Sequence, residues 1–445
     1  MKCGFSKKCI NPPLGTPLVG YYSERLSKGV LDDLYIKAAA FDDGENKAVV
    51  IEIDVCLLSE EFCDTVRSMI AEFCGIDANA VFICCDHTHT GPITMPDFAS
   101  DKAPDPAYIG FLQTSLRDTA AYALADLKPA RFFAAEAQAK GISFIRRYKM
   151  KDGTMKTNPV AEDPNIDCPL GEPNETVKLL KIVREGGDDL FIVSFGTHTD
   201  TTGGEYVSAD YPTYLSRTIE GALPGTNCMF LLGPQGDVNH FDPSKPNRGR
   251  VRPVNPTGDY RDACSHAQYM GRVIAGSVLS VCDKAQEISA DAIRFGSCSV
   301  EIPSQQENDA LEESIRINDL YESGRQNEIA PPGTHLTPII AKARRVIRLK
   351  DGPSSFRYKL FAVRIGDYVF AGLPGEPFTE IRNRIEAESP FANTMVCCLV
   401  NSSPGYFPTS QAYREGGYEV LTSVFGMGCD DALVNGMKGL LDSLK

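Results

Sequence analysis

Six apolar runs of strand length constrain the fold of this chain more than any other feature. The runs are rich in Val, Ile and Phe and mostly lack polar alternation, which is typical of strands covered on both faces. Helical patterns lie between them at 59–74, 106–127 and 262–281. This alternation predicts an α/β fold, with a mixed, largely buried β-sheet flanked by helices. The six runs are 48–53, 80–85, 190–195, 228–232, 368–371 and 394–400.

The pattern at 59–74 is the clearest helix. Gly75 is expected to end it, because glycine adopts the left-handed conformation that terminates helices. Its apolar residues recur at helical spacing and predict one buried face. These residues are Phe62, Val66, Met69, Ile70 and Phe73.

Composition narrows the class of protein. A chain of 445 residues has room for one large elaborated domain or for two. The formal net charge of -14 argues against nucleic-acid partners and anionic membrane surfaces. No apolar run approaches the ~20 residues that a membrane-spanning helix needs, so no such helix is expected. We see no signal peptide, and 15 cysteines then predict reduced thiols in the cytoplasm; Cys84, Cys85, Cys397 and Cys398 are expected in the core.

Histidines gather in the loops that follow the apolar runs. Four of the six histidines lie there, namely His87, His89, His198 and His240. Ligands in α/β proteins collect at the carboxyl ends of strands. We therefore expect a functional site where these loops meet.

The residue types in these loops suit a zinc site. In extended backbone His87 and His89 point to one side, and His198 adds a further neutral nitrogen. Glu376 is expected near a helix N-cap, before Pro377, and supplies a carboxylate. Hydrogen-bonded loop histidines and a simple acidic cap are the alternatives. The HxH motif occurs in several classes of metal hydrolase, so it does not by itself identify the class of this site.

Other polar segments have two interpretations each. Backbone amides near Gly236 suit an oxyanion, or simply form a turn. Arg146 and Arg147 suit a substrate clamp, or are solvated. The basic stretch 242–262 is a loop over the substrate, or a linker. His266 is expected in the core, and His335 lies in a Pro-rich loop, at the surface or in a lid.

Five motifs in order resemble the neutral/alkaline non-lysosomal ceramidase family. HTHTGP resembles the family's HTHSGP, GPQGDVNH its GDVSPN, and PGEPF its PGE-F-T motif. SFIRR resembles N-I-N-R, and YFPTSQAYREGGYE keeps the family's tyrosine spacing. The resemblance runs from residue 1 to about residue 421. It implies a zinc amidase with an α/β catalytic domain.

The resemblance also implies roles for individual residues. Zinc would be bound by His87, His198, Glu376 and Tyr406. His89 would lie behind the ligands or face the substrate. Arg146 would hold the substrate or the developing oxyanion, and Tyr418 matches a further active-site tyrosine.

Three departures separate this chain from the family. Asn239 replaces the family serine, so a covalent serine route is excluded at that position, and His240 replaces the next proline. The chain ends at Lys445, so we expect a single ceramidase-like catalytic domain over 1–445 without the C-terminal immunoglobulin-like domain. No export is indicated.

The sequence therefore predicts a cytoplasmic zinc hydrolase that cleaves an amide, or an ester, in a small polar substrate by means of a metal-activated water. Protons would be moved by His89, Asp237 or His240. Two alternatives stay open: a metal-dependent enzyme of non-amidase chemistry acting on a carbohydrate or cyclitol-like substrate, and an inert metal-binding homologue. The sequence does not predict an oligomer.

Overall fold

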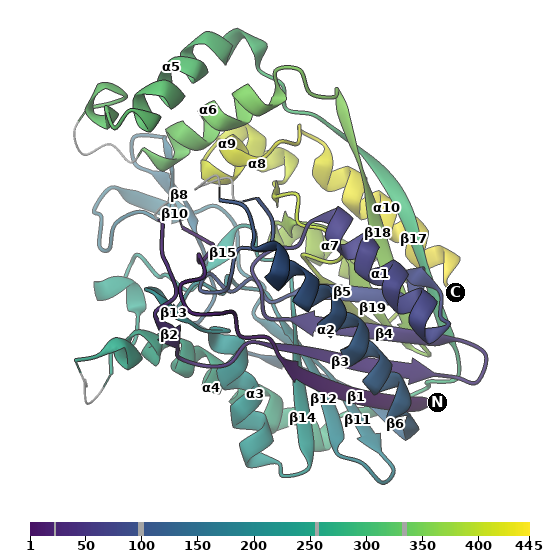
Figure 1. Cartoon of the computed structure of the whole chain (residues 1–445). Coiled ribbons are helices and arrows are strands. Elements are labelled where there is room, and N and C mark those ends of the chain that lie inside the picture. The colour runs from purple at the N-terminus through teal and green to yellow at the C-terminus, as the bar shows by residue number, and fades with distance from the viewer. Residues whose placement is uncertain (22–23, 97–101, 254–257, 332–335) are drawn as a thin grey trace.

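The computed structural model describes residues 1–21, 24–96, 102–253, 258–331 and 336–445. All six expected strands form, and the mixed α/β prediction is confirmed (Figure 1). Four of the six lie in one nine-stranded sheet. Along the sheet, β16 (Gln286–Ile288) pairs beside β6, and the other strands follow the order β14 (Thr226–Leu232), β12 (Asp189–Phe195), β11 (Thr176–Arg184), β6 (Lys128–Gln138), β1 (Lys2–Cys9), β3 (Tyr35–Asp42), β4 (Lys47–Ile53) and β5 (Val81–Cys85).

The two ends of this sheet are built alike and lie close together. β12 and β14 are parallel at one end, and β4 and β5 are parallel at the other. The Phe230 amide of β14 donates to the Glu52 carboxylate of β4 at 2.9 Å. The chain after residue 397 bridges the two ends, because Cys398 N donates to Leu232 O and Cys84 pairs with Val400. The carboxyl ends of β5, β12 and β14 are therefore neighbours.

A second, four-stranded sheet holds the other two expected strands. Its order is β17 (Ile293–Pro303), β18 (Ser355–Ile365), β19 (Tyr368–Gly372) and β21 (Asn393–Cys397), with β19 and β21 parallel. The remaining strands are short. One small sheet consists of β10 (Ile166–Pro169), β8 (Arg147–Met150) and β9 (Met155–Thr157). Three two-stranded sheets pair β2 (Gly29–Val30) with β13 (Tyr206–Val207), β7 (Phe144–Ile145) with β15 (Val238–Asn239), and β20 (Glu376–Pro377) with β22 (Tyr406–Phe407).

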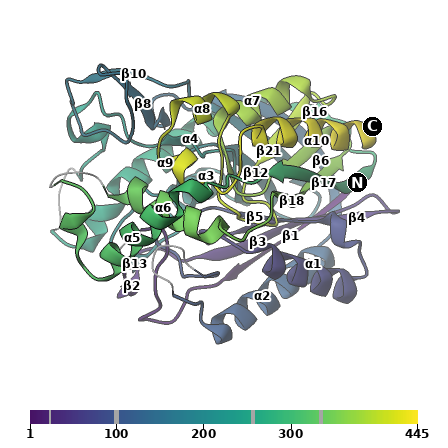
Figure 2. The same cartoon turned by 90° about the horizontal axis from the view of Figure 1, so that it is seen from above.

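Helices cover both sheets. Figure 2 shows α1 (Glu60–Cys74) and α2 (Pro106–Ala125) on one side of the strands, and α7 (Thr379–Glu388) and α10 (Cys429–Ser443) on the other. α3 (Tyr211–Ala222) packs on β14, and α4 (Ser265–Val281) packs on α3 and β6. Near the site lie α5 (Leu311–Glu322), α6 (Thr337–Leu349), α8 (Ser410–Glu415) and α9 (Tyr418–Thr422). Among the described residues, no helix has the length and apolarity to cross a membrane.

Gly4 of β1 explains how closely α2 approaches the sheet. A Cβ atom at this position would lie 1.9 Å from the backbone oxygen of Ala123 on α2. Only glycine permits this contact without moving the helix. This close contact lets α2 cover the large hydrophobic core on its face of the sheet.

Three helix predictions need adjustment. The helix at 59–74 forms with Ser59 as N-cap and Gly75 at φ 66°, but Phe73 is 63% exposed and lies under the Arg117 guanidinium. Cys63 and Arg67 occupy buried positions instead, because the buried stripe is rotated toward them. The helix expected at 106–127 ends at Ala125, and residues 260–264 form a 3-10 turn before α4.

The adjacent cysteine pairs are core residues, as expected. Cys84, Cys85, Cys397 and Cys398 are buried, and none of the chain's cysteines forms a disulfide. They pack as small apolar side chains where the two sheet ends meet.

A buried ion pair links the sheet ends. Lys37 Nζ lies 3.1 Å from Glu52 Oε1 and 3.2 Å from Ser216 Oγ of α3. Burial opposes the charge on Lys37, but Glu52 and Asp54 together with weaker contributions outweigh burial and raise the pKa of Lys37. Both side chains are satisfied only while β3, β4, β14 and α3 stay together.

We expect Glu52→Ala to destabilise the protein by about 3–5 kcal/mol, because it leaves a buried ammonium unpaired and the Phe230 amide without its acceptor. Urea unfolding measures the loss. Glu45→Ala removes an equal charge from an exposed turn and should change the free energy of unfolding by less than about 0.5 kcal/mol. Equal effects of the two substitutions would contradict the structural role of Glu52.

Candidate metal centre and active site

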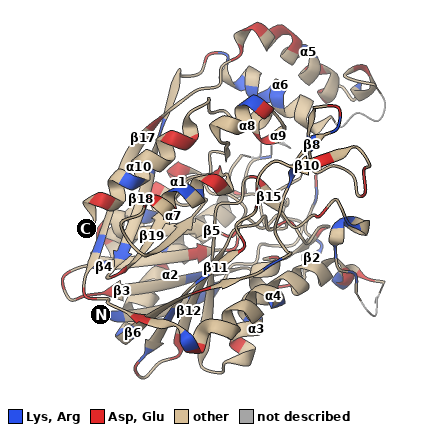
Figure 3. Ribbon diagram, turned by 180° about the vertical axis from the view of Figure 1, so that it is seen from behind, with Lys and Arg blue, Asp and Glu red and all other residues tan. Residues whose placement is uncertain are grey.

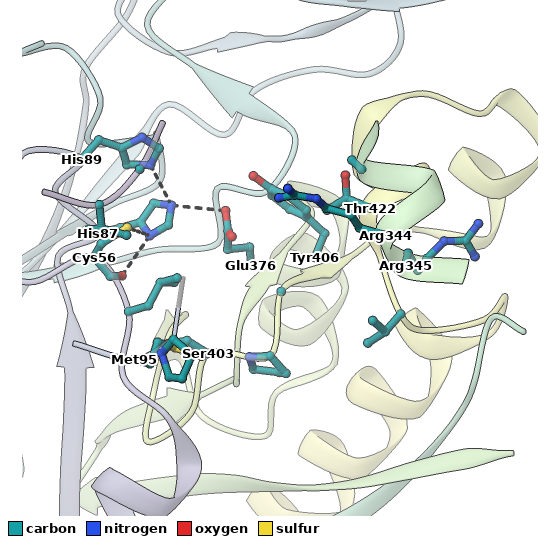
Figure 4. Close-up of a pocket in the computed structure, with 18 of the residues that line it drawn as sticks. Cys56, His87, His89, Met95, Arg344, Arg345, Glu376, Ser403, Tyr406 and Thr422 are labelled. Carbon is teal, nitrogen blue, oxygen red and sulfur yellow. Dashed lines mark hydrogen bonds and ion pairs between the residues drawn. The ribbon is translucent and has the colours of Figure 1, made fainter. Parts of the chain in front are cut away.

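Four strand ends bring the predicted ligands to one place. His87 follows β5, His198 follows β12, Glu376 begins β20 after β19, and Tyr406 begins β22 after β21. Figure 4 shows His87 and His89 pointing toward Glu376, with Tyr406 beside it. All of these residues are remote in sequence, so the fold alone assembles them.

The structure places three ligand atoms close together. Glu376 Oε2 lies 3.3 Å from His87 Nε2 and 3.3 Å from His198 Nε2. The three ligand atoms lie within 4.8 Å of one another, and all three side chains are buried. This trio is the candidate metal centre.

Both imidazoles are oriented by backbone carbonyls. His87 Nδ1 lies 3.0 Å from Cys56 O, and His198 Nδ1 lies 3.0 Å from the carbonyl oxygens of Gln235 and Val238. Since a carbonyl only accepts, each Nδ1 must carry the proton. Each Nε2 therefore faces the Glu376 carboxylate without a proton of its own, which is the usual arrangement of histidines that bind a metal. The lone pair of His198 Nε2 accepts from Arg146 Nη1 at 3.1 Å, a contact that a bound ion would replace.

The charge state of the trio suits a cation. Burial opposes ionisation of Glu376, but His87 and His198 overcome it and hold the pKa of the Glu376 carboxyl well below its usual range. Burial and the Arg146 guanidinium lower the pKa of His198, so this imidazole stays neutral. A carboxylate between imidazoles is a site that a divalent ion would complete.

The donor set fits zinc. Ligand atoms about 2.0–2.2 Å from a tetrahedral zinc lie about 3.3–3.6 Å apart, and both nitrogen–oxygen separations in the trio agree with this spacing. Two histidines and one carboxylate also match a common catalytic ligand set for zinc, which leaves a position for water or substrate. The residues present therefore fit the ion that the sequence predicts.

Short parallel pairing fixes the Glu376 carboxylate beside Tyr406. The two residues are register partners in the β20–β22 pair, and Glu376 N donates to Gly405 O. Glu376 lies two residues before Phe378, the N-cap of α7, and so is near the helix start as expected, but it does not cap the helix. Asp237 does so, since its Oδ1 accepts from both the amide and the hydroxyl of Thr379.

The histidine pair does not lie in extended backbone, contrary to expectation. His87 has φ 68°, in the left-handed region, and its amide donates to Val55 O. The rings nevertheless face one another, with 3.3 Å between His89 Nε2 and His87 Nε2. The turn at His87, rather than strand alternation, turns both side chains into the site.

Arg146 lies behind the trio. Its Nε donates to Glu419 Oε1 at 2.6 Å, its Nη2 donates to Gly236 O, and its Nη1 lies 3.1 Å from His198 Nε2. The guanidinium also stands 5.2 Å from the centre of the Tyr406 ring. Arg146 is buried and thus touches the ligands; its neighbour Arg147 is buried against Glu415 and Phe378, so it is not solvated.

The backbone near Gly236 does not present amides to a substrate, which corrects the oxyanion expectation. Gly236 N donates to Pro377 O, and Val238 N donates to Gln235 O. A Cβ at Gly236 would lie 2.4 Å from Glu376 O. The absence of a side chain at Gly236 therefore lets the backbone pack closely against Glu376.

The remaining predicted site residues lie around the trio. Asn239 is buried, donates to Asn158 Oδ1 and accepts from Phe241 N. His240 Nδ1 lies 3.0 Å from Asp200 Oδ1, and the His240 and His266 rings are 5.1 Å apart. The Tyr418 ring stands edge-on to Tyr406 at 5.9 Å.

A cavity of about 240 Å³ opens from the trio. Of the predicted residues, His87, His89, Glu376, Tyr406 and Tyr418 line it within the described part of the chain, whereas His198, Arg146, Asp237, Asn239 and His240 do not. Apolar side chains form much of the wall. These are Val19, Leu57, Met95, Pro96, Ala341, Pro404 and Val424.

His266 and the described part of the basic stretch do not belong to the trio. His266 is buried on α4, as expected, and accepts from Val251 N at its Nδ1. His335 lies outside the described residues. In the described part of 242–262, Arg250 donates to Thr201 O, which ties this stretch to the loop after His198.

Two solved structures share the fold of this chain. The neutral ceramidase from Pseudomonas aeruginosa superposes with a TM-score of 0.73, over 100% of this chain and 74% of its own, at 15% identity. The chain has the neutral ceramidase fold. A ceramidase complexed with C2 gives a TM-score of 0.72, over 100% of this chain and 75% of its own, at 16% identity. No family model and no curated protein matches the sequence of this ceramidase-like chain.

Sequence reasoning missed several polar groups of this candidate site. Glu419 anchors Arg146, and its only signal was the acid after Tyr418 in the tyrosine-rich segment. Cys56 also lies by the trio, with its Sγ 3.5 Å from His87 Nδ1, but a cysteine after a strand gives no specific signal. The arginines of α6 line the cavity, and their spacing was visible in the sequence.

We expect Gly236→Ala to lower zinc affinity by about tenfold or more, because the new methyl group displaces the Glu376 backbone without removing any ligand atom. Equilibrium binding against a competing chelator measures the affinity. Gly276→Ala, on an exposed turn of α4 with nothing within 4 Å, is the matched control and should bind zinc like the parent protein. Unchanged affinity in Gly236→Ala would refute the packing argument.

We also expect Asn239→Ser to produce no gain of amidase activity, because position 239 does not line the cavity. The substitution loses the hydrogen bond to Asn158, so stability should fall by about 1 kcal/mol. Hydrolysis rates and thermal unfolding measure the two effects. A new or much faster amidase activity would show that the hydroxyl reaches the substrate.

Proposed function

We propose that this protein is a zinc-dependent hydrolase that cleaves an amide bond, or an ester, in a small acyl substrate. The observation that carries the proposal is the buried trio of His87, His198 and Glu376, of which His87 and Glu376 line a largely apolar cavity. The ceramidase fold supports it. Such a trio without an opening would suit a structural ion, whereas this one is accessible to a substrate.

A zinc ion held by these residues would supply Lewis-acid chemistry, because it lowers the pKa of water toward ~7 and polarises a carbonyl group. The chain's own residues supply the rest. We assign His87, His198 and Glu376 as ligands and Tyr406 as the fourth. The pairing of Tyr406 with Glu376 supports the last assignment.

Arg146 acts as a positioning residue in this proposal. It holds Gly236 O, Glu419 and the ligand His198 at the same time, so it fixes the loops that carry the trio. Its position outside the cavity wall disfavours the substrate clamp that the sequence suggests. Loss of Arg146 should therefore act through the ligands.

Proton transfer is assigned to His89. Of His89, Asp237 and His240, only His89 lines the cavity. Its ring lies beside His87, and Arg25 Nη2 donates to its backbone oxygen. We assign Tyr418, which also lines the cavity, to donate a hydrogen bond from its hydroxyl to the oxygen of the bound carbonyl.

Two broader features accompany this proposal. All of the chain's cysteines are free thiols, which supports a reducing compartment such as the cytoplasm. The apolar wall of the cavity favours a substrate with an acyl portion over the carbohydrate-like alternative, because sugars need polar partners along their length.

We expect chelation to abolish hydrolysis of N-acyl compounds and added zinc to restore it. Glu376→Gln keeps the shape of the side chain but removes its charge, so it should lose at least tenfold in zinc affinity and most of the activity. Elemental analysis and rate measurements on an N-acyl panel with varied chain length check both expectations.

His266→Gln is the matched control, since it changes a buried histidine outside the trio and should keep zinc. Activity that is indifferent to chelation would refute the metal mechanism. Full zinc occupancy in Glu376→Gln would refute the ligand assignment.

A further inference from the structure

The cavity has opposite chemical characters at its two ends. At the inner end are His87, His89 and Glu376, and at the outer end are arginines of α6 (Figure 4). Glu376 is the only carboxylate on the described wall. Three arginines line the outer end, namely Arg344, Arg345 and Arg348.

The three arginines differ in how their charges are balanced. Arg344 Nη2 donates to Glu322 Oε1 of α5 at 2.6 Å, and Arg345 Nη2 donates to Glu307 Oε1 at 2.7 Å. Arg348 forms no ion pair or hydrogen bond with any described residue, and its side chain is exposed. The outer end therefore carries one cation that no carboxylate of the described chain neutralises.

Helical spacing directs Arg344 and Arg348 to the same face. They are separated by one turn of α6, so their side chains lie side by side on the wall. Figure 3 shows the basic residues gathered on α6 and acidic residues on α5. In a chain of net charge -14, this is an unusual concentration of positive charge at a cavity mouth.

We infer that the substrate carries an anionic group, a carboxylate or a phosphate, at the end remote from the bond that is cleaved. This inference rests on the proposed function and names its substrate class. The scissile carbonyl lies at the trio, the acyl portion lies along the apolar wall, and the anion pairs with Arg348 beside Arg344. Guanidinium groups bind both anions in the forked geometry that this pair offers.

The test uses matched charged and neutral N-acyl compounds with the full chain. One series, which serves as a control, compares N-dodecanoyl glycine with its primary amide; its charge lies next to the scissile bond, so Arg348 should not affect this pair. A second compares an ω-carboxy-dodecanoyl anilide with its methyl ester, and a third replaces the carboxylate by a phosphate monoester. The first two series place the charge on either side of the scissile bond, and the third distinguishes the anion.

Arg348→Gln should lower kcat/KM for the preferred charged compound about tenfold and change its neutral partner less than twofold. Raising the ionic strength should also lower the ratio of kcat/KM for the charged compound to kcat/KM for its neutral partner in the parent protein, because salt screens the ion pair. Lys350→Gln removes the same charge from the C-cap of the same helix, outside the cavity wall, and should leave both rates unchanged. Equal loss on charged and neutral compounds, or no loss, would overturn the inference.

A binding measurement separates this inference from the proposed function. Calorimetry on the zinc-depleted protein should show tighter binding of the charged compound, and Arg348→Gln should remove that preference. If no compound is hydrolysed but this preference is present, the hydrolase proposal fails and the anion site stands. If compounds are hydrolysed without any charge preference, the hydrolase proposal stands and the anion site fails.

Discussion

A buried carboxylate holds the two ends of the large sheet together, and the position of the trio depends on that closure. Glu52 accepts from Lys37 and from the edge amide of Phe230, so strands β4 and β14 cannot separate without exposing two unsatisfied groups. Closure brings the carboxyl end of β5 beside those of β12 and β14. His87 and His198 face each other because the sheet curls back on itself.

Backbone hydrogen bonds then determine how each ligand points. Carbonyl oxygens of Cys56, Gln235 and Val238 fix the tautomer of two imidazoles, so the scaffold controls which nitrogen is offered to a cation. The Arg146 guanidinium ties His198, Gly236 and Glu419 into one unit. The candidate metal centre is thus preorganised by groups that themselves need no metal.

The sequence predicted the strands and the trio better than it predicted local geometry. Apolar runs and strand-end histidines are local signals, and they identified β5, β12 and their loops. The role of Asp237 could not be foreseen, because its hydrogen bonds reach Thr379, far along the chain. The left-handed turn at His87 and the packing beneath Gly236 likewise depend on contacts with distant backbone. Contacts between segments that are remote in sequence cannot be predicted from the local sequence of either segment.

The segment from Cys398 to Tyr406 has an unusual consequence. Its amides and carbonyls form hydrogen bonds with β14, with β5 and with the residues that follow β19, and it ends as the partner of Glu376. An inserted or deleted residue in this segment would rotate Tyr406 to the opposite side of its strand. The same change would break the backbone hydrogen bonds that the segment makes with its neighbours. Homologous chains that keep this chemistry should therefore vary the length of almost any surface loop before they vary the length of this one.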